Sequence, residues 1–184
     1  MRYVLHYDNI ARLANIFAFP SQVLFVDADT LLFNDPWSIN QSLPNGPYDL
    51  RYQAERNAKE ECSGVSNGGQ ILVRRTNATK AYFANMKAHK AEILDGHHGL
   101  DQKFMIPAAI AAGAKHCSLD PTHFIGHCAG SRRKETDSEQ IVVFHTNCVG
   151  GDVKLKLDRL LHFYKVVRDE QGLKLNVTVG QVDV

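Results

Sequence analysis

The stretch that most constrains this chain is Val23–Leu32, VLFVDADTLL, in which an apolar run ends in two aspartates. Four consecutive apolar residues, 23–26, predict a fully buried strand. Asp27 and Asp29 follow at once, where such a strand emerges from a sheet. If the chain leaves the strand at Asp27, both carboxylates can converge on one divalent cation, and oxygen ligands suit Mg²⁺ or Mn²⁺. The alternative is an acidic turn whose carboxylates are solvated or cap the next segment.

A second apolar run, Ile141–Phe144, also predicts a buried strand, and it leads directly into His145. It repeats the pattern at Asp27, four apolar residues followed by a side chain that can bind a metal. A histidine in this position is more often a satisfied polar end of a core strand than a metal ligand. Gly150 and Gly151 follow, ahead of a predicted helix, and glycine-rich backbone before a helix N-terminus favours anions.

The remaining elements alternate between helical and extended patterns, which is typical of an α/β sheet. Turns are expected at Asn34–Pro36 and Asp120–Pro121. The polar stretch 49–63 predicts a loop or a short exposed helix, and Ser66–Gln70 (SNGGQ) predicts a turn or a close backbone approach before a strand. Apolar spacing predicts helices over 8–19, 77–89, 104–114 and 153–167, a strand at 71–73, a loop over 124–134 and an edge strand over 173–179.

Length and charge narrow the class of protein. A chain of 184 residues is one domain with room for a sizeable core, and a formal net charge of +1 gives no argument for a nucleic-acid partner. No apolar run is long enough to span a bilayer. The four cysteines include no CxxC pair and allow two disulfides in a secretory compartment, and three glycosylation sequons permit that route. Without an upstream targeting segment, a cytoplasmic protein is expected.

Four segments together resemble the nucleotide-diphospho-sugar transferase family of GT-A glycosyltransferases, which includes plant cell-wall xylosyl- and arabinosyltransferases. They are VLFVDADTLLFNDPW, SNGG with ILVR, the Asp101-Gln102 pair, and VVFHTNCVGGDVKLKLDRL. The resemblance covers Leu13–Phe163. It implies an α/β fold, a GT-A-like (Rossmann-like) mixed sheet flanked by helices. This domain would occupy residues 1–168, with a C-terminal edge strand or tail at 169–184, and much of the usual N-terminal nucleotide-binding unit would be absent.

The resemblance also implies a function and a site. The expected activity is metal-dependent transfer of a sugar, with retention, from a nucleotide-diphosphate donor, UDP-linked, to a glycan or glycoprotein acceptor in the Golgi or secretory lumen. Asp27, Asp29 and His145 would bind Mn²⁺ or Mg²⁺, and Asp101 would act at the reacting sugar. The donor would be bound by Asp27, Asn67, Gly68, Gln102, Gly150, Gly151 and Lys154. Many relatives carry Gly-Lys after the histidine, whereas Asp152 follows Gly151 here.

Two other functions fit parts of the pattern. A haloacid-dehalogenase-type phosphatase also opens with an apolar strand and Asp-x-Asp, the first Asp being a nucleophile. That pattern wants a threonine two residues beyond the second Asp, but position 31 is leucine. The other alternative is a transferase-like fold kept as a non-catalytic binding subunit, which metal-dependent nucleotide binding would distinguish from an enzyme.

Overall fold

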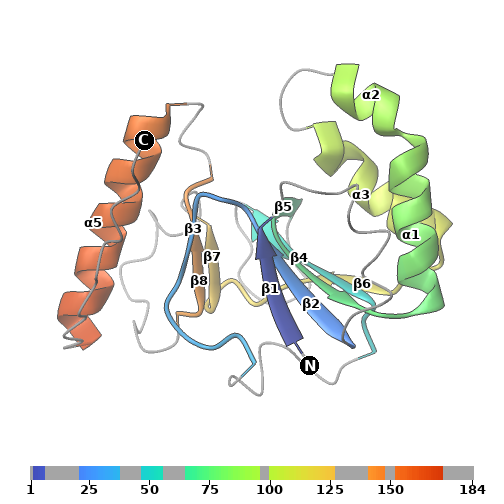
Figure 1. Cartoon of the computed structure of the whole chain (residues 1–184). Coiled ribbons are helices and arrows are strands. Elements are labelled where there is room, and N and C mark those ends of the chain that lie inside the picture. Colours follow the sequence, from blue (N-terminus) through green and yellow to red (C-terminus); the bar gives the residue numbers. More distant parts are fainter. Residues whose placement is uncertain are drawn as a thin grey trace.

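The computed structural model describes residues 2–6, 21–37, 47–55, 65–95, 100–126, 141–147 and 152–171, and the side chains of 2–6, 55, 65, 94–95, 100–101 and 168–171 are not described. These residues form four layers (Figure 1): a layer of helices, a five-stranded sheet, a three-stranded sheet and a final long helix. The fold is therefore α/β with mixed sheets flanked by helices, as the sequence predicts.

The larger sheet has the strand order β1-β2-β5-β4-β6. Its strands are β1 Arg2–His6, β2 Gln22–Val26, β4 Leu50–Glu55, β5 Val65–Arg74 and β6 His116–Ser118. β1 runs parallel to β2 and β6 parallel to β4, whereas β5 is antiparallel to both of its neighbours. The predicted strand at 23–26 is confirmed as the buried part of β2, with Val23 and Phe25 facing one apolar cluster and Leu24 and Val26 facing another.

The prediction of a loop or exposed helix over 49–63 is wrong for residues 50–55, because these form β4 between β5 and β6. Leu50, Tyr52 and Ala54 are buried at alternate positions, which is the period of a strand. The intervening Arg51 and Gln53 are equally buried, although polar side chains in alternation usually indicate a solvated face. Residues 56–64 lie outside the described part of the chain.

The strand expected at 71–73 is also longer than predicted. β5 begins at Val65, so the glycine-rich SNGGQ segment lies within a strand and forms no turn. Among the described glycines, only Gly113 has a positive φ, of 63°. Gly69 therefore does not adopt a left-handed backbone conformation. The glycine at position 69 therefore serves close approach and not an unusual dihedral angle.

Helices α1 Asn77–Ala88 and α3 Leu100–Ala111 cover one face of this sheet, and the short helix α2 Lys90–Asp95 packs against both of them. Thr76 caps α1, since its side chain accepts a hydrogen bond from Thr79 N while the Thr79 side chain receives one from Thr76 N. The helix expected at 104–114 begins earlier and ends earlier, so that Asp101 lies in its first turn. The core between these helices and the sheet is made of Val23, Phe25, Leu50, Tyr52, Ile71, Val73, Tyr82, Met86, Met105, Ala108 and Ala109.

The smaller sheet has the order β3-β8-β7, with β3 Thr30–Leu32, β7 Phe124–Gly126 and β8 Val143–His145. The second buried strand predicted at Ile141–Phe144 is thus confirmed, although β8 begins two residues later and ends one residue later. The loop expected from 124 begins with a strand. Helix α5, Val153–Gln171, packs on this sheet, and the ring centroids of Phe144 and Phe163 lie 3.6 Å apart. The expected helix at 8–19, the edge strand at 173–179 and most of the loop at 124–134 fall outside the described residues.

The expected turns at Asn34–Pro36 and Asp120–Pro121 are present, each closed by an aspartate side chain that accepts a backbone N–H two residues on. α5 extends to Gln171, so the expected domain limit at residue 168 falls in its last turn, and the tail beyond stays a prediction. None of the described helices is both long and apolar enough to cross a membrane.

Candidate active site

The chain turns sharply where β2 ends, and this turn brings the two aspartates to one place. Asp27 N donates to Gly69 O at 2.9 Å, which ends the pairing of β2 with β5. Thr30 Oγ1 then donates to Asp27 O at 2.7 Å, closing a turn over 27–30. The chain next enters β3, which belongs to the other sheet. Asp27 and Asp29 therefore stand at the junction of the two sheets.

His145 arrives at the same junction from the smaller sheet. It is the last residue of β8, between its register partners Thr30 in β3 and Gly126 in β7. Its Nε2 lies 3.4 Å from Asp27 Oδ2 and 3.2 Å from Asp29 Oδ1. Single ligand atoms from the three residues fall within 4.8 Å of one another, and the histidine is buried while the acids are partly exposed. Two carboxylates and an imidazole facing one point are a donor set suited to a divalent cation.

The carboxylate of Asp29 is surrounded by donors. Its Oδ2 accepts from Lys156 Nζ at 2.5 Å and from Thr146 Oγ1 at 3.1 Å, and Thr146 N donates to Asp29 O. Burial alone would raise the pKa of Asp29, but the hydrogen bonds and charges of His145 and Lys156 outweigh it and hold the pKa well below its usual 3.8. Asp29 is therefore ionised throughout the physiological range, as a cation ligand must be.

Three residues of this site were not predicted from the sequence. Gln53 in β4 lies behind the histidine, with its Oε1 2.8 Å from His145 Nδ1. Gly69 in β5 lies against the imidazole face, where a Cβ would be 2.0 Å from His145 Cε1. Lys156 contacts Asp29 from α5. Each lies on a face of its element whose burial is set by tertiary packing, which the local sequence pattern does not reveal.

The residues predicted to bind the donor occupy varied positions. Asn67 is buried in β5 and its Oδ1 accepts from Gly69 N at 2.7 Å, so part of its role is to shape the strand beside the histidine. Gly68 is buried beside it, and Gln102 is half-buried in α3. Lys154 is exposed in the first turn of α5. Gly150, Gly151 and the side chain of Asp101 lie outside the described residues, so their roles stay predictions.

The sequence of residues 11–160 matches the family profile described as nucleotide-diphospho-sugar transferase. The chain belongs to this family. Membership confirms the resemblance and sets aside the phosphatase alternative, although a closer kinship with plant xylosyltransferases has no support. No curated protein matches the chain in sequence.

Two solved glycosyltransferases resemble this nucleotide-diphospho-sugar transferase in fold. One is involved in glycosylation of the major capsid of PBCV-1, with a TM-score of 0.55 and 16% identity over 85% of this chain and 72% of that chain. The other is GlyE of Streptococcus pneumoniae TIGR4, with a TM-score of 0.50 and 15% identity over 90% of this chain and 46% of that chain. The chain thus spans less than half of the length of GlyE. These likenesses confirm a GT-A-like fold.

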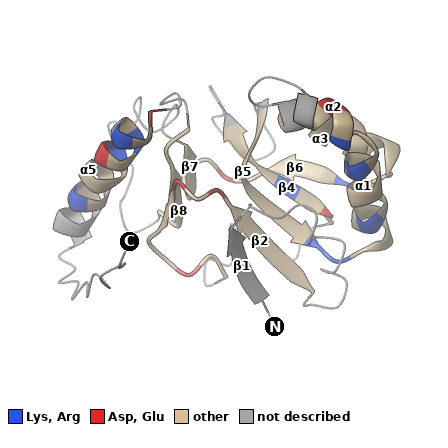
Figure 2. Cartoon of the chain, turned by 45° about the horizontal axis from the view of Figure 1, so that its top comes forward, with Lys and Arg blue, Asp and Glu red and all other residues tan. Residues whose placement is uncertain are grey.

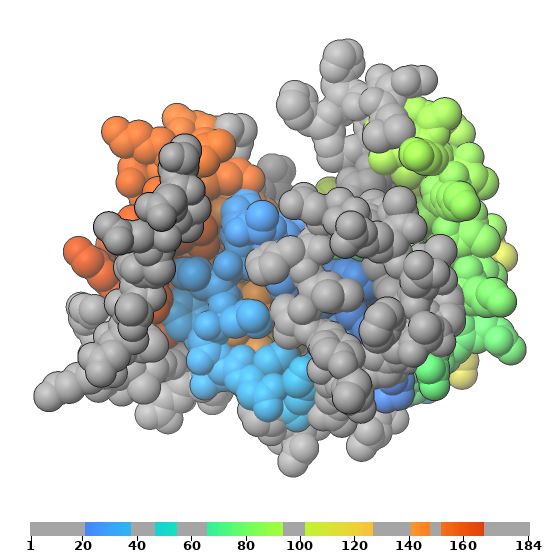
Figure 3. Space-filling view, viewed as in Figure 1, coloured from blue at the N-terminus to red at the C-terminus, as the bar shows by residue number. Residues whose placement is uncertain are grey.

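Acidic residues lie on the connection that leaves β2 between the two sheets in this transferase, while Lys and Arg outnumber acidic residues along the described part of α5, which also carries Asp158 (Figure 2). Residues 21–37 reach the surface between α5 and the helical layer (Figure 3), and the side chain of Asp27 is 35% exposed. The acidic pair can therefore be reached from solvent, beside a basic helix.

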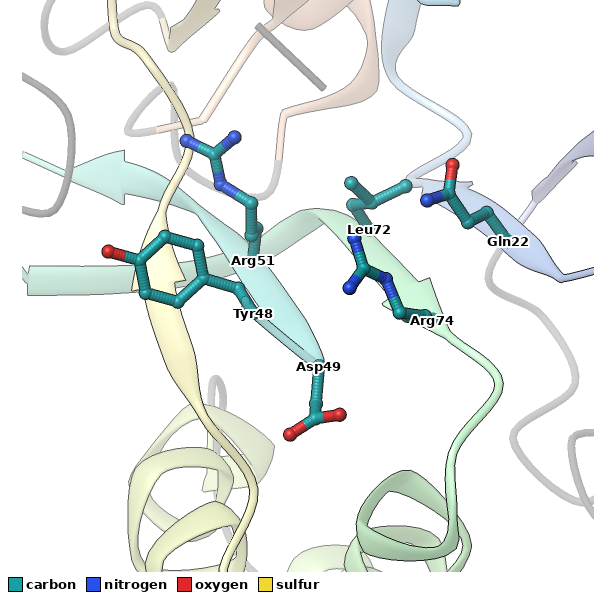
Figure 4. Close-up of a pocket in the computed structure, with 6 residues that line it drawn as sticks. All are labelled: Gln22, Tyr48, Asp49, Arg51, Leu72 and Arg74. Atoms are coloured by element: carbon teal, nitrogen blue, oxygen red, sulfur yellow. The ribbon is translucent and has the colours of Figure 1, made fainter. Parts of the chain in front are cut away.

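A small pocket lies at the opposite end of the larger sheet (Figure 4). Its lining comes from the start of β2, the start of β4 and the end of β5: Gln22, Tyr48, Asp49, Arg51, Leu72 and Arg74. Burial lowers the pKa of Arg51 to about 10, although Tyr48 and Asp120 act to raise it. The pocket is separated from the acidic pair by the length of β2, so it is no part of the candidate active site.

Proposed function

We propose that the protein is a metal-dependent glycosyltransferase that moves a sugar from a UDP-linked donor to a glycan or glycoprotein acceptor, with retention of the anomeric configuration. The observation that carries this proposal is the convergence of Asp27, Asp29 and His145 from two different sheets. In a member of this family, a cation held by such a cluster would have an evident ligand, the diphosphate of the nucleotide-sugar donor.

The three side chains fit Mn²⁺ or Mg²⁺. Adjacent ligands of an octahedral ion with bonds of about 2.1 Å lie roughly 3 Å apart. The Nε2–Oδ distances of 3.2 and 3.4 Å are close to that separation. A bound divalent cation would neutralise the charge that develops on the departing diphosphate. The two carboxylates suit both ions, and the imidazole nitrogen is the ligand that suits Mg²⁺ least, because Mg²⁺ is a hard cation that takes oxygen ligands.

We assign the basic contact to the diphosphate to Lys156. Its ammonium contacts Asp29 Oδ2. Lys154 lies two residues earlier, about half a turn away on the helix, and is exposed. A lysine whose side chain is 31% exposed at the acidic pair can turn from the carboxylate to a phosphate without any movement of α5. Asp101 and Gln102, at the start of α3, stay assigned to the sugar side of the donor.

Calorimetric titration of UDP into the protein, with Mn²⁺ and again with EDTA, tests the proposal. Binding that requires Mn²⁺ is expected, followed by sugar transfer in a screen of UDP-sugars, with the anomer of the product read by NMR. Metal-dependent binding without transfer to any acceptor would favour the non-catalytic subunit. UDP binding that is equal in Mn²⁺ and EDTA would contradict the site.

Lys156→Met should have opposite effects with and without nucleotide. Without it, the affinity for Mn²⁺ should rise by about fivefold, because the ammonium no longer competes for Asp29, a competition of ~1 kcal/mol for a partly exposed ion pair. With UDP present, binding should weaken, because the diphosphate loses a cation. Titrations of Mn²⁺ and of UDP measure the two effects, and Lys154→Met is the matched control. A fall in both affinities would show that Lys156 only supports the fold.

We also propose that the protein works in an oxidising secretory compartment. Cys117 in β6 is disulfide-bonded, which supports this location because cytosolic disulfides are rare. Cys62, Cys128 and Cys148 lie outside the described residues. Mass spectrometry of the protein purified from its native cells, with and without reduction before alkylation, checks the bond. A Cys117 that is fully alkylated without reduction would overturn the proposed location.

A further inference from the structure

The hydrogen bond behind His145 has a consequence for how the site binds its cation. Gln53 Oε1 lies 2.8 Å from His145 Nδ1, and the Gln53 side chain is completely buried. We propose that Gln53 is a positioning residue, which keeps the proton of the imidazole on Nδ1 and aims Nε2 at the cation position between Asp27 and Asp29. This inference rests on the proposed metal-dependent function.

The two ring nitrogens of His145 face different partners. Nδ1 meets the amide oxygen of Gln53, while Nε2 meets the two carboxylates. An imidazole that binds a cation through Nε2 must carry its proton on Nδ1. An amide oxygen only accepts, so it stabilises this tautomer and opposes the other. Because the amide is neutral, it does so without adding a third negative charge to the site.

The backbone is shaped to place this amide. The pairing of β4 with β5 shifts register at this point, since Tyr52 pairs with Ile71 but Gln53 pairs with Asn67, which leaves residues 68–70 of β5 without a register partner in β4. Irregular pairing of this kind is common next to active sites. On the far side, β7 approaches so closely that a Cβ on Gly126 would lie 2.2 Å from Gln53 Nε2. Gly126 is also the register partner of His145. The two sheets thus fix glutamine and histidine together at their junction.

The burial of Gln53 has a cost that packing does not explain. Within the described residues, its Nε2 has no hydrogen-bond partner. An unsatisfied buried polar group costs about 1–3 kcal/mol, so an apolar side chain would suit a purely structural position better. What glutamine adds at this position is an amide oxygen that contacts His145 Nδ1. This contact favours a role for Gln53 in the site over a purely structural role in the core.

Three variants separate these roles. Gln53→Met keeps the length of the side chain but removes the acceptor, and Gln53→Glu keeps the acceptor. Gln70→Met is the matched control, because Gln70 is an equally buried glutamine in the neighbouring strand whose amide contacts Ile125 O. Calorimetric titration of Mn²⁺ should show about 10- to 100-fold weaker binding for Gln53→Met, the usual effect of losing an outer-shell partner of a metal ligand. Gln53→Glu and Gln70→Met should bind within about threefold of the wild type.

A second measurement does not need the metal. Long-range ¹H–¹⁵N NMR spectra of histidine-labelled, metal-free protein report which ring nitrogen carries a proton. We expect His145 Nδ1 to be protonated in the wild-type protein and in Gln53→Glu, and no longer uniformly so in Gln53→Met. A wild-type ring protonated on Nε2 alone would overturn the role of Gln53, even if Gln53→Met fails to fold.

The outcomes distinguish the two proposals. Wild-type protein that binds no Mn²⁺ would overturn the proposed function itself. Wild-type protein that binds Mn²⁺, together with a folded Gln53→Met variant that binds it equally well, would overturn only the role of Gln53. Equal weakening by Gln53→Met and Gln70→Met would also overturn it, because any buried glutamine would then have the same effect.

Discussion

Asp29→Asn is expected to abolish Mn²⁺-dependent binding of UDP, weakening it by more than about 100-fold. The substitution keeps the shape of the side chain and removes only its charge and one ligand oxygen. Even the outer-shell partners of metal ligands contribute 10- to 100-fold to affinity, so the loss of a direct ligand should exceed that. Asp29 is also the residue on which the other groups converge, since His145 Nε2 and Lys156 Nζ both contact its carboxylate.

Asp35→Asn is the matched control for this variant. Asp35 lies on the same connecting segment but is exposed, and its Oδ1 accepts from Trp37 N, a contact that asparagine preserves. Calorimetry of UDP with Mn²⁺ should therefore show wild-type affinity for Asp35→Asn. Equal binding by Asp29→Asn and the wild type would remove Asp29 from the cation site.

The same residue should link stability to pH in the metal-free protein. Because the pKa of Asp29 is depressed in the folded state, the unfolded chain binds this proton first as pH falls. The stabilisation from Asp29 is complete above about pH 5 and is lost as pH falls through 3.8 towards the folded-state pKa. Thermal unfolding in EDTA should show the difference between wild type and Asp29→Asn shrinking over that range. A difference that grows with acidity would contradict the contacts of Asp29.

The core of the site was predictable because it rests on two strong local signals. The runs Val23–Val26 and Ile141–Phe144 are long enough in apolar residues to mark buried strands, and each ends in a side chain that can bind a cation. The sequence alone does not reveal that the two strands belong to different sheets. Their ends meet because the chain changes sheets within the turn over 27–30, a turn closed by a single threonine.

Gln53 and Lys156 were missed because each lies on a face whose burial depends on tertiary packing. Residues 49–63 are polar and charged overall, so the apolar alternation of Leu50, Tyr52 and Ala54 did not indicate a strand. The polar side chain of Gln53 between them is buried against β7 of the second sheet. Lys156 shares one helical face with Leu160, Phe163 and Val167, the residues that pack on the smaller sheet. Lys154 was predicted because it is the lysine nearest to Gly150 and Gly151 in the sequence. The helical spacing from Leu160, Phe163 and Val167 instead indicates that Lys156 is the lysine that faces the site.

Gly69→Ala should damage the site from the opposite side of His145. The added Cβ would lie 2.0 Å from His145 Cε1 and 2.2 Å from Nδ1, so the buried ring must move. Its movement would break the contact with Gln53 and take Nε2 away from the acids. We expect Mn²⁺ affinity to fall by at least about tenfold, as for a lost outer-shell partner. Overpacking should lower the free energy of unfolding by about 1–3 kcal/mol.

Gly113→Ala separates this steric effect from the loss of a glycine as such. Gly113 has a φ of 63° and nothing within 4 Å of the position of its Cβ, so alanine there strains only the backbone. That variant should lose about 1 kcal/mol of stability and bind Mn²⁺ normally. The double variant Gly69→Ala with His145→Ala is the sharper test, because truncating the ring removes the clash. The double variant should lose less stability than the sum of the losses measured for the two single variants, while Mn²⁺ binding stays absent. Additive effects on stability would mean that the imidazole of His145 does not lie against Gly69.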